Sequence, residues 1–333
     1  MSVQKHVDLA IYRANIHAIM QEMAPAKVMA VVKADAYGHG LIEISKAAVQ
    51  AGIDFLGVLD IETGLELRKA GINTACFAWL HSPQSNFSAA VRFGIELSVS
   101  SLAELKSISA ASGVAKVHLK IDTGLSRNGC RIELWPELVK NAMELQKTNA
   151  IEVVAIWSHL SGTSRADDLK AISLFEEASE IAKSAGFSGY RHIAASPAAY
   201  FLPESRFDLV RIGVSAFGTS PLEGVEASEL GLTSPMTLTA EVIDNGVISV
   251  GFLHGYFSQL AKHSSVIIGE KSLRVLEVGP LASRIENGDY LPGDEVFVFG
   301  GPAISAEQLC ELAGTVTDEL FTGLKASSVT YSD

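Results

Sequence analysis

The chain has 333 residues, of which 48% are hydrophobic and 19% are charged, a composition typical of packed globular proteins and unlike that of disordered chains. Single hydrophobic cores rarely grow beyond about 250–300 residues, so we expect one large domain and one smaller domain. The formal net charge of -12 disfavours a nucleic acid as partner, because polyanions are bound by clustered lysines and arginines.

The sequence carries no sign of membrane insertion or secretion. No stretch is as long and apolar as a membrane span, and the first residues, MSVQKHVDLAIYRANI, lack the apolar core of a signal peptide. Cys76, Cys130 and Cys310 are odd in number and have neither metal-ligand nor redox spacing. We therefore predict a cytoplasmic protein with reduced thiols and no metal site.

Short apolar runs alternate with amphipathic stretches over the first two thirds of the chain. The runs lie at 28–34, 54–59, 75–80, 96–99, 116–122, 153–160, 190–196 and 209–218, and helical patterns such as 133–147 and 167–185 intervene. Eight buried strands alternating with helices predict a parallel sheet closed into a (β/α)8 TIM barrel. An open doubly wound sheet has the same alternation, so the pattern alone leaves both folds open.

The texture changes after about residue 230. Short strands broken by Gly, Asn and Pro follow one another, with little helical periodicity until 305–314. This pattern predicts an all-β C-terminal domain. We place the α/β barrel at 10–225 and the β domain at 226–333.

Polar side chains stand at the ends of the predicted barrel strands. They are Lys33, Asp122, Arg127, His159, Ser196 and Arg211, and Gly213 lies close to the last of them. In a barrel of this kind the carboxyl ends of the strands meet at one mouth, which holds the active site. We therefore expect these residues to converge.

Lys33 directly follows the apolar run VMAVV, where loss of water favours the neutral amine that Schiff-base chemistry needs. An isolated lysine at a strand end is more often a snorkelling side chain. Tyr37, Gly38 and Gly40 come next, in a loop before a helix, where backbone NH groups and a phenol can receive phosphate oxygens.

Several segments resemble those of the alanine racemase family, whose members use pyridoxal 5′-phosphate (PLP). VVKADAYGHG at 31–40 resembles the PLP-attachment signature, and KIDTGLSRNG at 120–129 resembles the arginine-bearing segment. SHLSG at 158–162, AASPAA at 194–199 and VRIGVSAFGTSP at 210–221 resemble the cofactor-binding segments. The resemblance covers roughly residues 1–222.

The resemblance implies a role for each matching residue. Lys33 would hold PLP as a Schiff base and move a proton at Cα, and Arg127 would bind the substrate carboxylate. The other implied residues are Tyr37, Ser196, Gly213 and Val214 for the phosphate, Arg211 for the pyridine nitrogen, His159 for the ring, and Lys120 as a lysine that is carbamylated in many members. It also implies a homodimer with shared active sites, and an N-terminal strand within 1–9 that joins the β domain.

The C-terminal domain departs from the family pattern at the second acid/base group. Racemisation needs one such group on each face of the cofactor, and in the family the second is a tyrosine from the partner subunit. The matching stretch here is GFLHGY at 251–256, which places Phe252 at that position and leaves His254 and Tyr256 as candidates. The family's C-terminal tyrosine, which helps to hold the phosphate, has no clear match here, because Tyr331 lies too close to the end of the sequence to align with it.

Three functions stay open at this point. The first is a PLP-dependent amino-acid racemase that interconverts L- and D-alanine or another small amino acid. The second is a non-racemising PLP enzyme, such as a decarboxylase, transaminase or lyase, because Lys33 alone can manage protons on one face. The third is a PLP carrier or regulatory protein. We favour the racemase.

Overall fold

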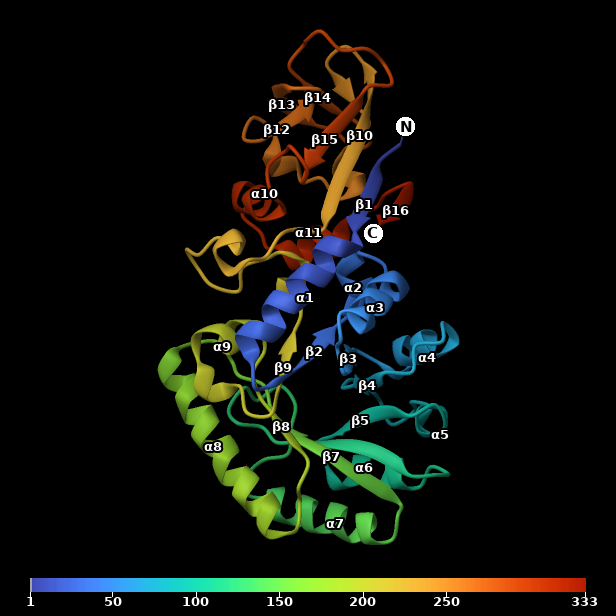
Figure 1. Ribbon diagram of the computed structural model, residues 1–333, viewed down its shortest axis with the longest axis vertical. Coiled ribbons are helices and arrows are strands. Elements are labelled where there is room, and N and C mark those ends of the chain that lie inside the picture. The colour runs from blue at the N-terminus through green and yellow to red at the C-terminus, as the bar shows by residue number, and fades with distance from the viewer. Residues whose placement is uncertain (1) are drawn as a thin grey trace.

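The computed structural model describes residues 2–333, with a β domain at one end and an α/β barrel at the other (Figure 1). The barrel strands, all paired in parallel, are β2 (Lys27–Val31), β3 (Phe55–Val58), β4 (Ala75–Ala78), β5 (Ile95–Val99), β6 (Ala115–Lys120), β7 (Ile151–Trp157), β8 (Tyr190–His192) and β9 (Leu209–Ile212). Neighbours pair in the order β8-β7-β6-β5-β4-β3-β2-β9. A bridge between Ala195 and Arg211 joins the β8 edge of this sheet to the β9 edge. The predicted barrel is therefore confirmed, and the alternative of an open sheet is excluded.

Helices follow the strands around the outside of the barrel. They are α3 (Leu41–Gln50), α4 (Ile61–Lys69), α5 (Phe87–Arg92), α6 (Leu102–Ser109), α7 (Trp135–Lys147), α8 (Arg165–Ser184) and α9 (Ser196–Phe201). Capping side chains explain where several begin: Asp60 accepts from the Thr63 amide, and Ser164 accepts from the Asp167 amide. The two helices predicted at 133–147 and 167–185 correspond to α7 and α8.

The C-terminal domain contains eight strands, in agreement with the predicted β domain. They are β1 (Gln4–Asp8), β10 (Met236–Asp244), β11 (Val247–Ile248), β12 (Ser265–Ile268), β13 (Lys271–Val278), β14 (Ser283–Ile285), β15 (Glu295–Phe299) and β16 (Ser328–Ser332). β11 pairs with both β10 and β14, which closes six strands into a barrel, and β1 and β16 extend it beyond β10. The helix predicted at 305–314 is α10 (Ala306–Ala313), whereas α11 (Thr317–Gly323) was not foreseen.

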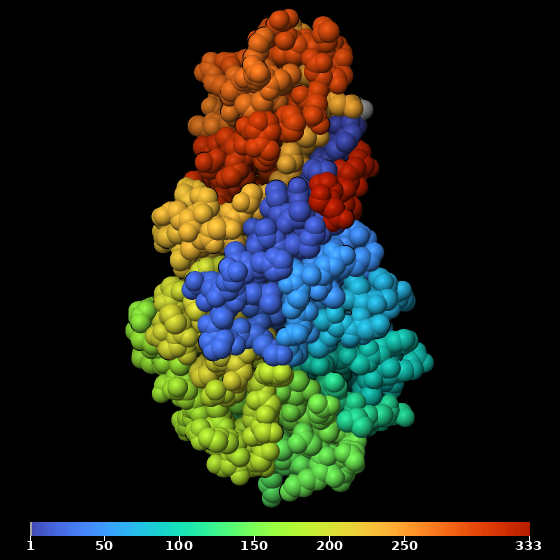
Figure 2. Space-filling view, viewed as in Figure 1, coloured from blue at the N-terminus to red at the C-terminus, as the bar shows by residue number. Residues whose placement is uncertain are grey.

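The two ends of the chain meet where the domains join. Helix α1 (Leu9–Met23) leads from β1 to the barrel, and Arg13 on it forms a 2.8 Å ion pair with Asp333. Figure 2 shows the C-terminal segment packed beside this N-terminal helix. One apolar core runs through both domains, from Val7 and Ile16 to Leu238 and Phe321, so the β domain packs directly against the barrel.

None of the helices within residues 2–333 combines the length and apolar character that crossing a membrane requires.

Candidate active site

The predicted site residues from the barrel gather at the carboxyl ends of its strands. Lys33 follows β2, Lys120 ends β6, His159 follows β7, Ser196 follows β8 and Arg211 lies in β9. Arg211 donates to His159 Nδ1 at 3.0 Å. Arg211 and Lys120 both lie against the ring of Trp157, at 5.1 and 4.3 Å from its centre. The barrel mouth is thus a single site, as the parallel strands predict.

Lys33 opens a turn, α2 (Lys33–Gly38), with an unusual backbone. Ala34, Asp35, Ala36 and Tyr37 all have φ between 50° and 54°, a run of four left-handed residues none of which is glycine. Left-handed helical geometry costs about 1–2 kcal/mol per L-residue. Such conformations persist where surrounding contacts impose them, and they gather at functional sites.

This turn brings a phenol to the place where the phosphate is expected. A methyl group at Gly213 would overlap Tyr37 Oη, so only glycine lets the two segments approach this closely. The Gly213 amide donates to Ser196 Oγ at 3.2 Å, and Val214 begins the short helical turn that follows. Burial raises the pKa of Tyr37, and Asp318 raises it further, so the phenol stays protonated as a donor.

The donor set at this end of the site suits a phosphate. Tyr37 Oη, Ser196 Oγ and the Gly213 amide lie together, and Tyr37 Oη occupies the space that a Cβ at residue 213 would take. Ser215, which follows directly, has a buried hydroxyl that finds no hydrogen-bond partner within residues 2–333. The residues present therefore fit the phosphate of PLP, although the nearby carboxylate of Asp318 carries the same sign of charge as a phosphate.

Arg211 is buried in the barrel and is held by four acceptors. Its guanidinium donates to His192 Nδ1 and His159 Nδ1, both at 3.0 Å, and to the carbonyl oxygens of Ser158 and Ile193. An arginine has donors only, so each ring nitrogen that it contacts must carry a lone pair. This fixes His159 and His192 with their protons on Nε2.

A chain of buried side chains continues from Arg211 through the barrel interior. His192 Nε2 lies 2.9 Å from His118 Nδ1, and His118 Nε2 lies 2.7 Å from Glu96 Oε2. Because His192 carries its proton on Nε2, it donates to His118, which in turn donates to Glu96. Phe77 stacks on His118 at 4.0 Å and Trp157 stacks on His192 at 5.7 Å, which fixes both rings.

The sequence analysis does not identify this row of hydrogen-bonded side chains. The signal was present as single polar residues inside the strand patterns, His118 in KVHLKID and His192 in YRHIAAS, with Glu96 at the start of ELSV. Strand alternation alone cannot say which of them point into a barrel.

His159 lies against the guanidinium of Arg211 and is mostly buried. Burial lowers its pKa to about 3, and the cations Arg211, Arg127, Lys120 and Lys33 reinforce the effect. The ring is therefore neutral, which suits contact with a flat cofactor ring and does not suit proton transfer at neutral pH.

Lys120 is nearly enclosed, with its ammonium 4.3 Å from the centre of the Trp157 ring. Burial, followed by the charges of Arg211 and Arg127, lowers its pKa to about 8. Arg127 itself is exposed and makes no hydrogen bond or ion pair within the part of the chain that is described. Asp122, at the start of the same loop, accepts from the amides of Gly124 and Ser126.

The two candidates for the second acid/base group differ sharply. Tyr256 is fully buried in the β domain, where its hydroxyl lies 2.8 Å from Ser264 Oγ and burial raises its pKa to about 12. This contradicts the prediction of a catalytic Tyr256, because a phenol enclosed in its own domain cannot reach another subunit's site. His254 is only partly buried, and its Nδ1 accepts from the Gly251 amide at 3.2 Å, while its Nε2 makes no hydrogen bond within residues 2–333.

Phe252 is 46% exposed, beside Leu253 at 53%. The amides of Phe252 and Leu253 donate to the carbonyl oxygens of Gly279 and Pro280, which brings the loop of Leu281 alongside. Leu281 is 48% exposed. We refer to Phe252, Leu253 and Leu281 as the apolar patch.

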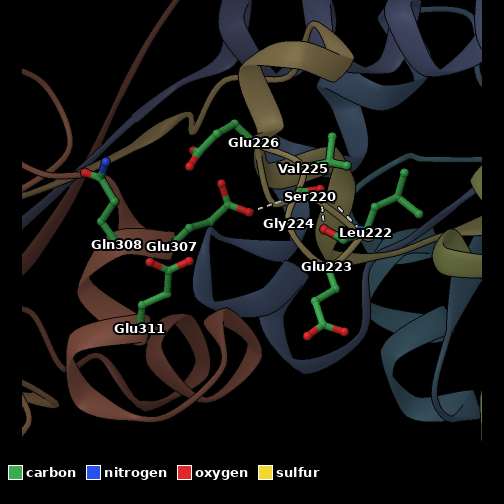
Figure 3. Close-up of a pocket in the computed structure, with 9 residues that line it drawn as sticks. All are labelled: Ser220, Leu222, Glu223, Gly224, Val225, Glu226, Glu307, Gln308 and Glu311. Atoms are coloured by element: carbon green, nitrogen blue, oxygen red, sulfur yellow. Dashed lines mark hydrogen bonds between the residues drawn. The ribbon is translucent and has the colours of Figure 1, made fainter.

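A separate pocket of about 290 Å³ lies between the segment 220–226 and α10 (Figure 3). Glu223, Glu226, Glu307 and Glu311 line it, and Glu307 accepts from the Ser220 amide at 2.6 Å. None of the predicted site residues lines this pocket. Within residues 2–333 no group of His, Cys, Asp and Glu side chains has the arrangement of a metal site.

Comparison with known proteins bears directly on the barrel. The family model of the alanine racemase N-terminal domain matches residues 7–221. An alanine racemase from Salinispora tropica is 38% identical, with 78% of this chain and 72% of that protein aligned. One from Mycolicibacterium smegmatis is 31% identical, with 96% of this chain and 92% of that protein aligned.

Solved structures extend the likeness to the whole chain. Alanine racemase from Streptomyces coelicolor A3(2) has a TM-score of 0.92 and 30% identity, covering 100% of this chain and 98% of that one. Alanine racemase from the D-cycloserine producing Streptomyces lavendulae has a TM-score of 0.93 and 29% identity, covering 100% and 97%. The match includes the β domain, where the sequence departs most from the family motifs. The chain belongs to the alanine racemase family, whose members depend on pyridoxal 5′-phosphate.

Proposed function

We propose that this protein interconverts L- and D-alanine, with PLP held at the barrel mouth by Lys33. The observation that carries the proposal is the donor set around one mouth: Tyr37, Ser196 and Gly213 at the phosphate end, and Arg211 in the barrel behind it. When bound there, PLP supplies an electron-withdrawing system that makes the Cα proton of an amino acid removable.

The site residues then take separate roles in the reaction. Lys33 anchors the cofactor and takes or returns the Cα proton on one face. Arg127, exposed and without a partner in the described chain, pairs with the substrate carboxylate through its planar fork of donors. Arg211 carries donors only, so beside the pyridine nitrogen of PLP it would keep that nitrogen unprotonated.

The opposite face needs a second group, because racemisation breaks the Cα–H bond on one side and forms a Cα–H bond on the other. Phe252 has no exchangeable proton. We assign the role to the partner subunit's His254, since its Nδ1 is already occupied and its Nε2 is free to transfer a proton.

We further propose a homodimer in which the apolar patch lies against the second subunit. Three large apolar side chains, Phe252, Leu253 and Leu281, are close to half exposed on one small area, which marks an interaction surface.

Leu253→Glu should shift the protein to monomers in sedimentation and reduce activity in parallel. Leu291→Glu, an exposed leucine outside the patch, is the control and should leave both unchanged. A dimer that survives the first change would remove the patch from the interface.

We place the protein in the cytoplasm, since Cys76, Cys130 and Cys310 are all buried free thiols, as a reducing compartment maintains.

The test of function is incubation of L- and D-alanine separately in deuterated water, with Cα exchange and chirality followed over time. We expect deuterium in both enantiomers, with inversion. Exchange from one enantiomer without inversion would assign a one-sided reaction, and release of pyruvate, CO2 or ammonia would name it. Borohydride should trap the cofactor on Lys33. If the protein binds the cofactor but turns over no amino acid, the result would favour a PLP carrier over an enzyme.

Separate variants identify the second group. His254→Ala should lower the racemisation rate by at least about 100-fold, which is the ordinary scale of general acid–base catalysis. Tyr256→Phe should leave it within a few-fold, and Phe252→Tyr should raise it. Equal rates in His254→Ala and the unaltered protein would remove His254 from the mechanism.

A further inference from the structure

The left-handed turn after Lys33 is held by segments that lie outside the α/β barrel. At Gly38, with φ of 73°, an added Cβ would overlap the carbonyl oxygen of Phe321 in α11. At Gly40, with φ of 98°, an added Cβ would overlap Tyr331 Oη in β16. The turn therefore sits in a socket formed by the C-terminal segments, with the Phe321 carbonyl against Gly38 and the Tyr331 hydroxyl against Gly40.

The third wall of this socket is β1, through Lys5. Its ammonium donates to the carbonyl oxygen of Gly38 at 2.7 Å, and the side chain is only 7% exposed. Burial lowers the pKa of Lys5, and the nearby carboxylate of Asp35, inside the same turn, acts in the opposite direction. A buried ammonium is costly unless it is hydrogen-bonded, so its contact with the last residue of the turn is a specific one.

The turn has hydrogen bonds of its own as well. The Ala36 amide donates to the Val32 carbonyl, the Gly40 amide donates to the Asp35 carbonyl, and the Leu41 amide donates to Asp35 Oδ1. These bonds close the turn on itself without joining it to the rest of the molecule. A backbone with four left-handed residues relaxes towards ordinary geometry unless contacts from outside prevent it.

We propose that Lys5 is a positioning residue that holds the left-handed turn in its socket and thereby fixes where the Lys33 amine stands at the barrel mouth. This rests on the proposed role of Lys33 as the cofactor anchor. Lys5 touches neither cofactor nor substrate. It acts through the Gly38 carbonyl, five residues along the chain from Lys33.

The first test uses the cofactor-free protein, so it does not depend on the reaction. Lys5→Met keeps the length of the side chain and removes its donor. Amide hydrogen exchange of Ala36, His39, Gly40 and Leu41 should become at least about tenfold faster, the effect on local opening of losing one charge-assisted hydrogen bond. Exchange in β6 should not change. Lys27→Met is the matched control, since Lys27 lies at the other end of β2 in a surface pair with Asp54.

The second test is titration of the cofactor-free protein with PLP, followed by the absorbance of lysine-bound cofactor. Lys5→Met should bind PLP about tenfold more weakly, and Lys27→Met should bind it normally. Unaltered protein that fails to bind PLP would overturn the proposed function and leave the exchange result standing by itself. Unchanged exchange or unchanged PLP affinity in Lys5→Met would overturn the positioning role, and so would equal acceleration in the turn and in β6.

Should Lys5→Met fail to fold, Lys5→Arg and Lys5→Gln decide the matter. Arginine keeps a cationic donor of sufficient reach, so its local exchange and PLP affinity should stay near those of the unaltered protein. Glutamine is shorter and neutral, so it should behave as predicted for Lys5→Met. The same result from both variants would overturn the proposal.

Discussion

The guanidinium of Arg211 donates to His192 Nδ1 at 3.0 Å, and this contact determines the protons on the next two side chains of the barrel interior. His192 must carry its proton on Nε2, so it donates to His118, which donates to Glu96. A buried arginine is thereby connected to a buried carboxylate through two neutral rings. The charge of Glu96 offsets that of Arg211 across the barrel, and the orientation of each ring depends on the one beyond it.

Glu96 is therefore expected to matter as an acceptor. Glu96→Leu removes the partner of the His118 Nε2 proton and leaves a buried donor unsatisfied, which costs about 1–3 kcal/mol in the free energy of unfolding. Glu96→Gln retains an oxygen that can accept the same proton and should lose less. Urea unfolding of the two variants measures the difference. Equal losses would show that the charge of Glu96, and not its hydrogen bond, is what the barrel requires.

Gly213 and Tyr37 should behave as a coupled pair. Gly213→Ala puts a methyl group where Tyr37 Oη stands, so the variant should bind PLP at least about tenfold more weakly. Tyr37→Phe removes that oxygen and should recover part of the loss when combined with Gly213→Ala. Titration of the four proteins with PLP gives the coupling energy directly. Additive losses would mean that the two residues do not meet at the phosphate end of the site.

Stability should fall as the solution becomes acidic, because three buried histidines resist protonation. Burial lowers the pKa of His39 and that of His159 to about 3, and burial followed by Arg211 lowers the pKa of His192 well below 6.5. The unfolded chain takes up these protons below about pH 6.5 while the folded protein does not. The stabilisation is thus complete above pH 6.5 and is lost as the pH falls towards 3.

Each group adds a slope of up to about 1.4 kcal/mol per pH unit. The free energy of unfolding, measured between pH 7.5 and 5.5, checks this. His159→Gln should reduce the slope. A flat profile over that range would contradict the assignment of neutral rings.

Much of the barrel could be predicted because its sequence signals are local. Apolar runs of strand length predict eight strands alternating with helices, though not their closure into a barrel, and Lys33, Arg127, His159, Ser196 and Arg211 lie in or shortly after these runs. The C-terminal domain gave weaker information, since β11 and β14 are short and closure depends on pairings between distant segments. Tyr256 is a candidate from sequence because it is the phenol nearest to Phe252, but burial inside a domain cannot be read from proximity in sequence.

Two features of the site depend entirely on tertiary contacts. The left-handed backbone at 34–37 is formed by alanine, aspartate and tyrosine, residues whose own preferences point elsewhere, so only the socket around them explains it. In the sequence, Lys5 is an ordinary polar residue of an N-terminal strand. Its contact with Gly38 is visible only in the structure, where β1 lies beside the turn after Lys33.

Lys120 is expected to carry a carbamate. Burial, Arg211 and Arg127 lower its pKa to about 8, so near that pH a large share of Lys120 is the neutral amine. In that form the nitrogen attacks CO2, a proton leaves to solvent, and a carboxylate results, which places a negative charge beside Arg127 and Arg211. Carbon-13 NMR of protein equilibrated with labelled bicarbonate should show a carbamate signal that strengthens from pH 6.5 to 8.5. Lys120→Met should abolish the signal, and Lys116→Met, an exposed lysine on the same strand, should not. The same signal in protein with Lys120→Met would place the carbamate on another lysine.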